Sequence, residues 1–75
     1  MTFSEKLKCI REEKGFTQKQ VATAMGISQQ AYGQYESGSR EPKMETICRI
    51  AAALGVEWVE LYPDNKSASM AYINA

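Results

Sequence analysis

The sequence of 75 residues lacks histidine and contains only two cysteines. Without an imidazole group, the Ser-His and Cys-His pairs of nucleophilic catalysis and any histidine metal site are excluded. Cys9 and Cys48 lie on separate helical patterns, so a zinc cluster or a disulfide framework is not expected, and we expect both to be reduced thiols in the core. A Gly-rich phosphate loop ending in Gly-Lys-Ser/Thr is also missing. The sequence therefore predicts no enzyme, no metal site and no cofactor.

Long apolar segments and an excess of one charge are missing as well. No run approaches the roughly 18 residues that span a bilayer, and residues 1–14 mix charged with apolar positions, unlike a signal peptide. We expect a soluble, cytoplasmic protein without a membrane partner. The basic and acidic side chains number nine each and give a formal net charge of zero, so any positive field that attracts an acidic partner must be local.

The residues that are present predict one small all-α domain. Hydrophobic residues make up 44% of the chain and are spread along it to about Tyr62, so we expect residues 1–62 to fold together. The segment 63–75 begins with Pro63 and is small and polar apart from three apolar residues. Two interpretations of this tail stay open, a flexible end or a segment that associates with a dimer partner.

Capping residues and glycines divide the first half of the chain into three helices. Thr2 or Ser4 can cap the first helix, which we expect to end near Lys14, before Gly15. A capping box, Thr17 with Gln20, opens the second. Ser28 can cap the third. The second and third helices are therefore expected at 18–25 and 29–36.

Apolar spacing predicts two more helices in the second half. The fourth helix carries an apolar stripe and ends at Gly55; the stripe contains Met44, Ile47, Cys48, Ala51 and Leu54. A short fifth helix follows at 56–62, with Trp58 and Leu61 expected in the core. A second interpretation makes Trp58 and Tyr62 part of a partner-binding patch.

Two short helices joined by a three-residue turn at 26–28 are typical of a helix-turn-helix, which sets its second helix in the major groove of DNA. At 100° per residue, the tyrosines of the third helix fall on one face and Gln29, Gln30, Gly33 and Gln34 on the other. Glutamine amides can read adenine through its N6 and N7 atoms. Gly33 costs about 1 kcal/mol relative to alanine in a helix, and we interpret it as allowing close approach to the groove. The alternative is an ordinary solvated face.

An amide face attracts phosphate weakly, so the phosphate contacts must come from residues around it. Lys19, Arg40 and Lys43 are the candidates, although each could equally be an ordinary surface charge. The amino ends of the second and fourth helices could add main-chain N–H groups and the positive end of the helix dipole.

Several motifs together resemble the Cro/C1-type (XRE-like) helix-turn-helix family over about residues 4–62. They are Thr17-Gln18, Val21-Ala22, Gly26-Ile27-Ser28-Gln29, Tyr35-Glu36, Gly38, Arg40, Pro42, Ile50-Ala51 and Leu54-Gly55-Val56. The resemblance implies a compact five-helix, lambda-repressor-like domain. It also implies that Gln29 and Gln30 read base edges, that Gln34 supports this readout, and that Gln18 contacts a phosphate or an outer base pair. Arg11 and Glu36 match a structural ion pair of the family. Tyr32, Gly33 and Tyr35 in the third helix, and the segment 63–75, depart from the family pattern.

The expected function is that of a transcriptional regulator that binds double-stranded DNA. A phage-type repressor acting as a homodimer on a palindromic operator, without a small-molecule ligand, is the leading form. An antitoxin or a restriction-modification controller would be variants of it. The alternative from another class is a protein-interaction adaptor whose DNA face is unused, which the zero net charge favours.

Overall fold

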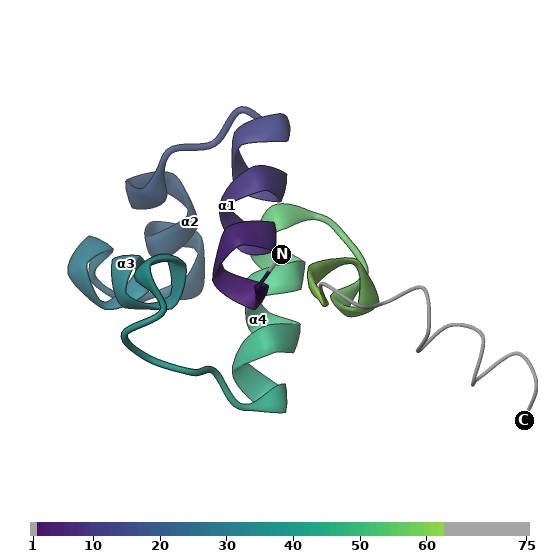
Figure 1. Cartoon of the computed structure of the whole chain (residues 1–75). Helices are drawn as coiled ribbons and strands as arrows, with labels where there is room; N and C mark the ends of the chain where they lie inside the picture. Colours follow the sequence, from purple (N-terminus) through teal and green to yellow (C-terminus); the bar gives the residue numbers. More distant parts are fainter. Residues whose placement is uncertain (1, 63–75) are drawn as a thin grey trace, which may run out of the picture.

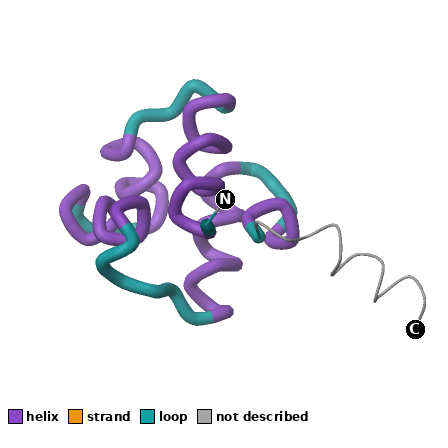
Figure 2. The backbone as a smooth tube through the Cα atoms, in the orientation of Figure 1, coloured by secondary structure: helices purple, strands orange, loops and turns teal. Residues whose placement is uncertain are grey.

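The computed structural model describes residues 2–62, and all regular structure within this range is helical (Figures 1 and 2). This confirms the predicted all-α class; the tail predicted at 63–75 lies outside the described residues. The elements are α1 (Phe3–Glu13), α2 (Gln18–Met25), α3 (Gln29–Ser37), α4 (Met44–Leu54) and the 3-10 helix η1 (Trp58–Leu61).

The pair α2 and α3 lies on one side of α1 and α4, and η1 lies on the opposite side (Figure 1). α3 packs against α1 and α2, α4 packs against α2, and η1 packs against α4 and α1. Every helix contributes to one shared core, which consists of Leu7, Ile10, Val21, Ala22, Met25, Tyr32, Tyr35, Ile47, Ile50, Ala51, Leu54 and Leu61.

Local hydrogen bonds fix the helix-turn-helix. In the α2 capping box, the Thr17 hydroxyl accepts from the main-chain N–H of Gln20 at 3.0 Å, and the side-chain oxygen Oε1 of Gln20 accepts from the main-chain N–H of Thr17 at 2.8 Å. Gly26 then takes a left-handed conformation, with φ of 73°, which the absence of a Cβ permits. The Ser28 hydroxyl accepts from the N–H of Ala31 at 3.0 Å and begins α3. Both helices therefore begin at the predicted residues.

The fifth helix is shorter than predicted. It is a single 3-10 turn of four residues, Trp58–Leu61, in place of a helix over 56–62. Val56 closes the end of α4 through its N–H, which donates to the Ala51 carbonyl at 3.0 Å. Glu57 is extended, with φ of -76° and ψ of 145°, so the helix begins only at Trp58. Leu61 is fully buried as expected, whereas Trp58 is only partly buried.

The expectation that both cysteines are core residues is wrong, because Cys9 and Cys48 are exposed. On α1 the buried stripe runs through Leu7 and Ile10, and Cys9 stands about 200° around the helix from Leu7. On α4 the stripe passes through Ile47, and Cys48 lies beside it.

Met44, expected in the apolar stripe of α4, is also outside the core. As the first residue of the helix it is 43% exposed. Its sulfur accepts a hydrogen bond from the Tyr62 hydroxyl at 3.5 Å, and Tyr62 in turn meets Trp58 edge-on, with ring centroids 5.4 Å apart. The first residue of α4 and the residues around η1 are thus joined by side chains outside the core.

Candidate nucleic-acid interface

α3 has one buried and one exposed face, as the spacing predicts. Tyr32 and Tyr35 are buried in the core. Gln29, Gln30 and Gln34 are all exposed. The tyrosines therefore anchor the helix while the three primary amides are free to meet a partner.

Gly33 lies in α3 with no internal reason to be glycine. The positive φ angles belong to other glycines, so the main chain at residue 33 suits any L residue. A Cβ placed there would meet a single atom, Oε1 of Gln18, at 3.7 Å, which is ordinary van der Waals contact. Alanine would therefore fit within the protein.

The predicted partners Arg11 and Glu36 are brought together by the fold. The Arg11 Nε donates to Glu36 Oε2 at 2.5 Å and its Nη2 donates to Oε1 at 3.2 Å, with side-chain exposures of 11% and 3%. The remaining Nη1 donates to the Phe16 carbonyl at 2.7 Å. One guanidinium group therefore connects α1 to α3 and to the loop that precedes α2.

Gln18 joins the same carboxylate, a contact that the sequence did not reveal. Its Nε2 donates to Glu36 Oε1 at 3.0 Å. Glu36 therefore links three helices, α1 through Arg11, α2 through Gln18 and α3 through its own main chain. No local motif signals this bond, because it joins residues 18 apart in the chain.

The pKa values follow from this burial and pairing. Burial by itself raises the pKa of Glu36, but hydrogen bonds to its carboxylate, chiefly from Arg11, outweigh that effect and lower it. The hydrogen bond from Arg11 to Glu36 raises the pKa of the guanidinium. Burial, and then the neighbouring Glu36, raise the pKa of the Tyr32 hydroxyl. The cluster is therefore an ionised Arg11–Glu36 pair beside a neutral phenol at neutral pH.

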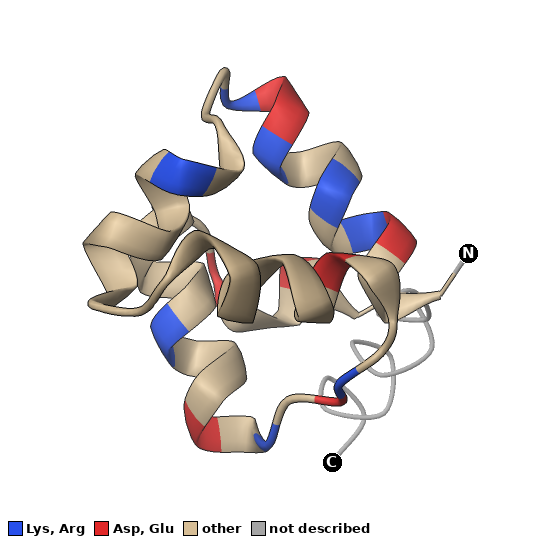
Figure 3. Ribbon diagram, turned by 90° about the vertical axis from the view of Figure 1, so that its left-hand side faces the viewer, with Lys and Arg blue, Asp and Glu red and all other residues tan. Residues whose placement is uncertain are grey.

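The basic candidates lie around α3 and not on it. α2 and α3 together carry one lysine, Lys19, and one acid, Glu36. The ribbon on this side of the molecule is accordingly mostly uncharged (Figure 3). Lys19, Arg40 and Lys43 are all exposed. The structure thus leaves the three cations exposed on segments of the chain other than α3.

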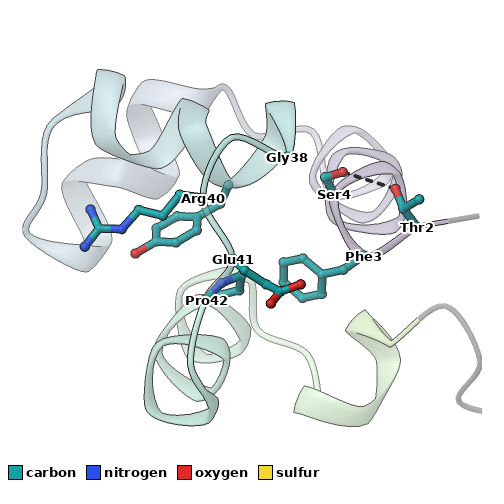
Figure 4. Close-up of a pocket in the computed structure, with 8 residues that line it drawn as sticks. Thr2, Phe3, Ser4, Gly38, Arg40, Glu41 and Pro42 are labelled. Carbon is teal, nitrogen blue, oxygen red and sulfur yellow. Dashed lines mark hydrogen bonds between the residues drawn. The ribbon is translucent and has the colours of Figure 1, made fainter.

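Arg40 lies beside a shallow pocket between the start of α1 and the loop after α3. Its guanidinium carbon is 5.8 Å from the centre of the Tyr35 ring, a cation-π distance. The guanidinium points away from Phe3 and Thr2, which line the opposite side of the pocket (Figure 4). The pocket is lined by Thr2, Phe3, Ser4, Tyr35, Gly38, Arg40, Glu41 and Pro42.

The amino ends of α2 and α4 differ in how their N–H groups are satisfied. At α4 the N-cap residue, Lys43, makes no side-chain cap hydrogen bond. At α2 the Thr17 hydroxyl accepts from Gln20, which leaves the N–H groups of Gln18 and Lys19 without a side-chain acceptor. The main-chain N–H groups at both ends can therefore donate hydrogen bonds to a bound anion.

Arg49 is a second long-range contact that sequence reasoning missed. Its Nη2 donates to the carbonyl of Met25, the last residue of α2, at 2.8 Å. A cation from α4 thus caps the negative end of the α2 dipole and stabilises the orientation of the helix-turn-helix against the rest of the fold.

Residues 2–62 offer neither a metal site nor a membrane-spanning helix. No group of three or more acidic or cysteine side chains there could hold a metal ion. In the same range no helix has the length and apolar character needed to cross a membrane.

Comparison with known sequences identifies relatives of this helical arrangement. The helix-turn-helix family model HTH_3 matches residues 7–61. The prophage-derived HTH-type transcriptional regulator YonR of Bacillus subtilis is 43% identical over 54 residues, covering 72% of this chain and 50% of YonR. The CTXphi phage transcriptional repressor RstR of Vibrio cholerae is 35% identical over 65 residues, covering 87% of this chain and 59% of RstR. The chain thus spans about half to three fifths of these relatives' lengths.

Solved structures show the same fold. The restriction-modification controller protein C.AhdI from Aeromonas hydrophila superimposes with a TM-score of 0.76 at 32% identity, covering 80% of this chain and 91% of that protein. The P22 c2 repressor, solved in complex with a synthetic operator, has a TM-score of 0.73 at 22% identity, covers 84% of this chain and 96% of its own, and shares the fold. On the family match over residues 7–61 and the identity to these regulators, the chain belongs to the Cro/C1-type helix-turn-helix family.

Proposed function

We propose that this chain is a phage-type transcriptional repressor that binds a specific double-stranded DNA operator by placing α3 in the major groove. The observation that carries the proposal is the face formed by Gln29, Gln30 and Gln34, which is exposed while the opposite face of α3 is anchored in the core. A repressor of this kind blocks polymerase by occupying the site and needs no catalytic group, cofactor or small-molecule ligand. We place it in the cytoplasm with the DNA.

Base reading is assigned to the exposed amides. A primary amide can donate to N7 and accept from N6 of one adenine, so Gln29 and Gln30 suit direct readout, with Gln34 in support. Gly33 contributes by its lack of a side chain, since nothing inside the protein requires a glycine there. These residues supply specificity and little general affinity.

Phosphate binding is assigned to the groups around α3. Lys19, Arg40 and Lys43 are exposed cations, and the free main-chain N–H groups of Gln18 and Lys19 add the positive end of the α2 dipole. These contacts set the register of the protein on the duplex without reading sequence.

We further propose that the repressor acts as a homodimer on a palindromic operator. Two copies of a helix-turn-helix reach half-sites about one helical turn apart, roughly 34 Å, when they are related by a two-fold axis. The side of the domain opposite α2 and α3, where Trp58 and Tyr62 are only partly buried, is the side left for the second copy (Figure 1).

Selection from a random duplex library at moderate salt, followed by sequencing of the retained DNA, tests the proposal. A palindromic consensus supports dimeric operator binding. A single enriched half-site would support operator binding and refute the dimer. A folded protein that enriches no sequence and shows no salt-dependent retention would refute the repressor and favour a protein-interaction adaptor, the function with which the zero net charge is compatible.

A further inference from the structure

The side-chain amide of Gln18 has only one chemically possible orientation. Its neighbour is the Glu36 carboxylate, 3.0 Å away and already paired with Arg11. An ionised carboxylate accepts hydrogen bonds and donates none, so the atom of Gln18 that faces it must be the nitrogen. The lowered pKa of Glu36 keeps the carboxylate ionised at neutral pH. The carbonyl oxygen, Oε1, must therefore point the other way.

Oε1 of Gln18 is left without a donor. It makes no hydrogen bond with any of the described residues, and the side chain is only partly buried. The position where a Cβ of residue 33 would stand is 3.7 Å from this oxygen. Since residue 33 is glycine, the oxygen is uncovered beside the base-reading face of α3.

An uncovered carbonyl oxygen selects its partner by charge. It repels the oxygens of a phosphate, so this atom does not suit the DNA backbone. The donors on the floor of the major groove are the exocyclic amino groups, N6 of adenine and N4 of cytosine. We propose that the Gln18 carbonyl accepts a hydrogen bond from such an amino group, that Glu36 orients it, and that Gly33 keeps it accessible. This inference rests on the proposed operator binding and assigns the Gln18 carbonyl to sequence reading, leaving phosphate to its main-chain N–H and to the second hydrogen of Nε2.

Three variants separate this role from a phosphate contact. Gln18→Met removes donor and acceptor at nearly constant volume. Gln18→Lys keeps a donor for Glu36 or phosphate but has no acceptor. Gly33→Ala covers the oxygen with a methyl group and leaves the Gln18 to Glu36 bond in place. Each is compared with the unaltered protein by library selection, by affinity for its operator and by thermal melting.

One operator base pair is expected to lose its preference in all three variants, by about five- to tenfold, the size of one hydrogen-bonded base contact. The other positions keep theirs in the two Gln18 variants, whereas Gly33→Ala also weakens the readout that depends on close approach of α3 to the groove. Gly33→Ala melts at the same or a higher temperature, so its loss of preference cannot be ascribed to unfolding. Replacing that adenine by purine, or that cytosine by 2-pyrimidinone, removes the amino group from the operator. The loss of affinity that this change causes is expected to be five- to tenfold larger for the unaltered protein than for Gln18→Met.

Two results would overturn the inference while operator binding stands. One is an unchanged base preference at every position in Gln18→Lys. The other is a uniform loss on all sequences, with a shallower salt dependence, in Gln18→Met, as a phosphate contact requires. If the unaltered, folded protein selects no sequence, the proposed function fails first and the inference falls with it.

Discussion

At the scale of single residues, Glu36 connects α3 to both α1 and α2. Its carboxylate accepts from Arg11 and Gln18 while its side chain is only 3% exposed. A charge this buried is stable only with its partners in place, because desolvation alone disfavours ionisation. The side chains around it are therefore expected to be the least tolerant of substitution in the half of the domain that contains α3.

Replacing Arg11 by alanine is expected to lower the free energy of unfolding by about 3 kcal/mol, since it leaves a buried carboxylate unpaired. Chemical denaturation at pH 7 measures the change. Lys8→Ala, an exposed lysine on the same helix, is the matched control and should change stability by less than about 0.5 kcal/mol. Equal stability of Arg11→Ala and the unaltered protein would show that the ion pair is not structural.

Stability should also fall in acid because of Glu36. Its pKa is lower in the folded chain than the ordinary value of 4.5, so the folded state favours the ionised form. This contribution is fully present above about pH 4.5 and is lost as the pH falls through the lower, folded pKa.

Thermal melting between pH 7 and pH 2.5 tests this. Glu36→Gln should be less stable at pH 7, and its stability should change less with acid than that of the unaltered protein. Parallel curves for the two proteins would contradict the assignment. Glu5, whose pKa is lowered by the main-chain hydrogen bond from Thr2, remains in both proteins and supplies a common background.

At the scale of elements, local signals decided most of what could be predicted. The capping box of Thr17 and the N-cap Ser28 act within four residues, and they place α2 and α3 where the sequence predicts. The fifth helix is shorter than the spacing predicts because Glu57 has an extended main chain, which a spacing of apolar residues does not reveal. The cysteines were misplaced because a small apolar residue beside a stripe is compatible with either side of a helix.

In the candidate site, too, features set by local spacing could be predicted and contacts between helices could not. Exposure of the glutamines follows from helix periodicity, which the sequence contains. The bonds from Gln18 to Glu36 and from Arg49 to Met25 join different helices. They depend on how helices pack, and no spacing in the chain encodes them.

Gln30→Ala is expected to weaken binding to the selected operator by about 1–3 kcal/mol and binding to random DNA very little. The same holds for Gln29→Ala. Titration of a labelled duplex of each kind gives both affinities. Gln20→Ala is the control for loss of an exposed glutamine outside α3. It should lower the free energy of unfolding, because it removes a hydrogen bond of the α2 cap, without lowering the preference for the operator. Equal losses on operator and random DNA would remove these residues from base reading.

Lys43→Ala should act differently because its site is the amino end of α4. Loss of one phosphate contact weakens binding to all sequences alike and reduces the magnitude of the slope of log K against log salt by about 1. Lys14→Ala, an exposed lysine after α1, is the control. If random DNA is bound as before, Lys43 does not contact phosphate.

At the scale of the whole molecule, α3 and the proposed dimer side lie at opposite ends of one core (Figure 1). If two copies associate through the side of η1, Trp58→Ala should lower the affinity for a palindromic operator far more than for an isolated half-site. Sedimentation of the free protein and binding to both duplexes measure this. A similar loss of affinity for both duplexes would show that Trp58 contributes to folding and not to dimerisation.

The uncharged face of α3 also affects how the protein distributes itself along DNA. α2 and α3 carry a single lysine between them. If α3 enters the groove as proposed, we expect unrelated duplex to hold the protein weakly, because that attraction comes almost wholly from cations. In the presence of a large excess of bulk DNA, a greater share of the molecules stays unbound and free to search. Occupancy of a single operator is then reached with fewer copies than a strongly basic repressor of equal operator affinity would need.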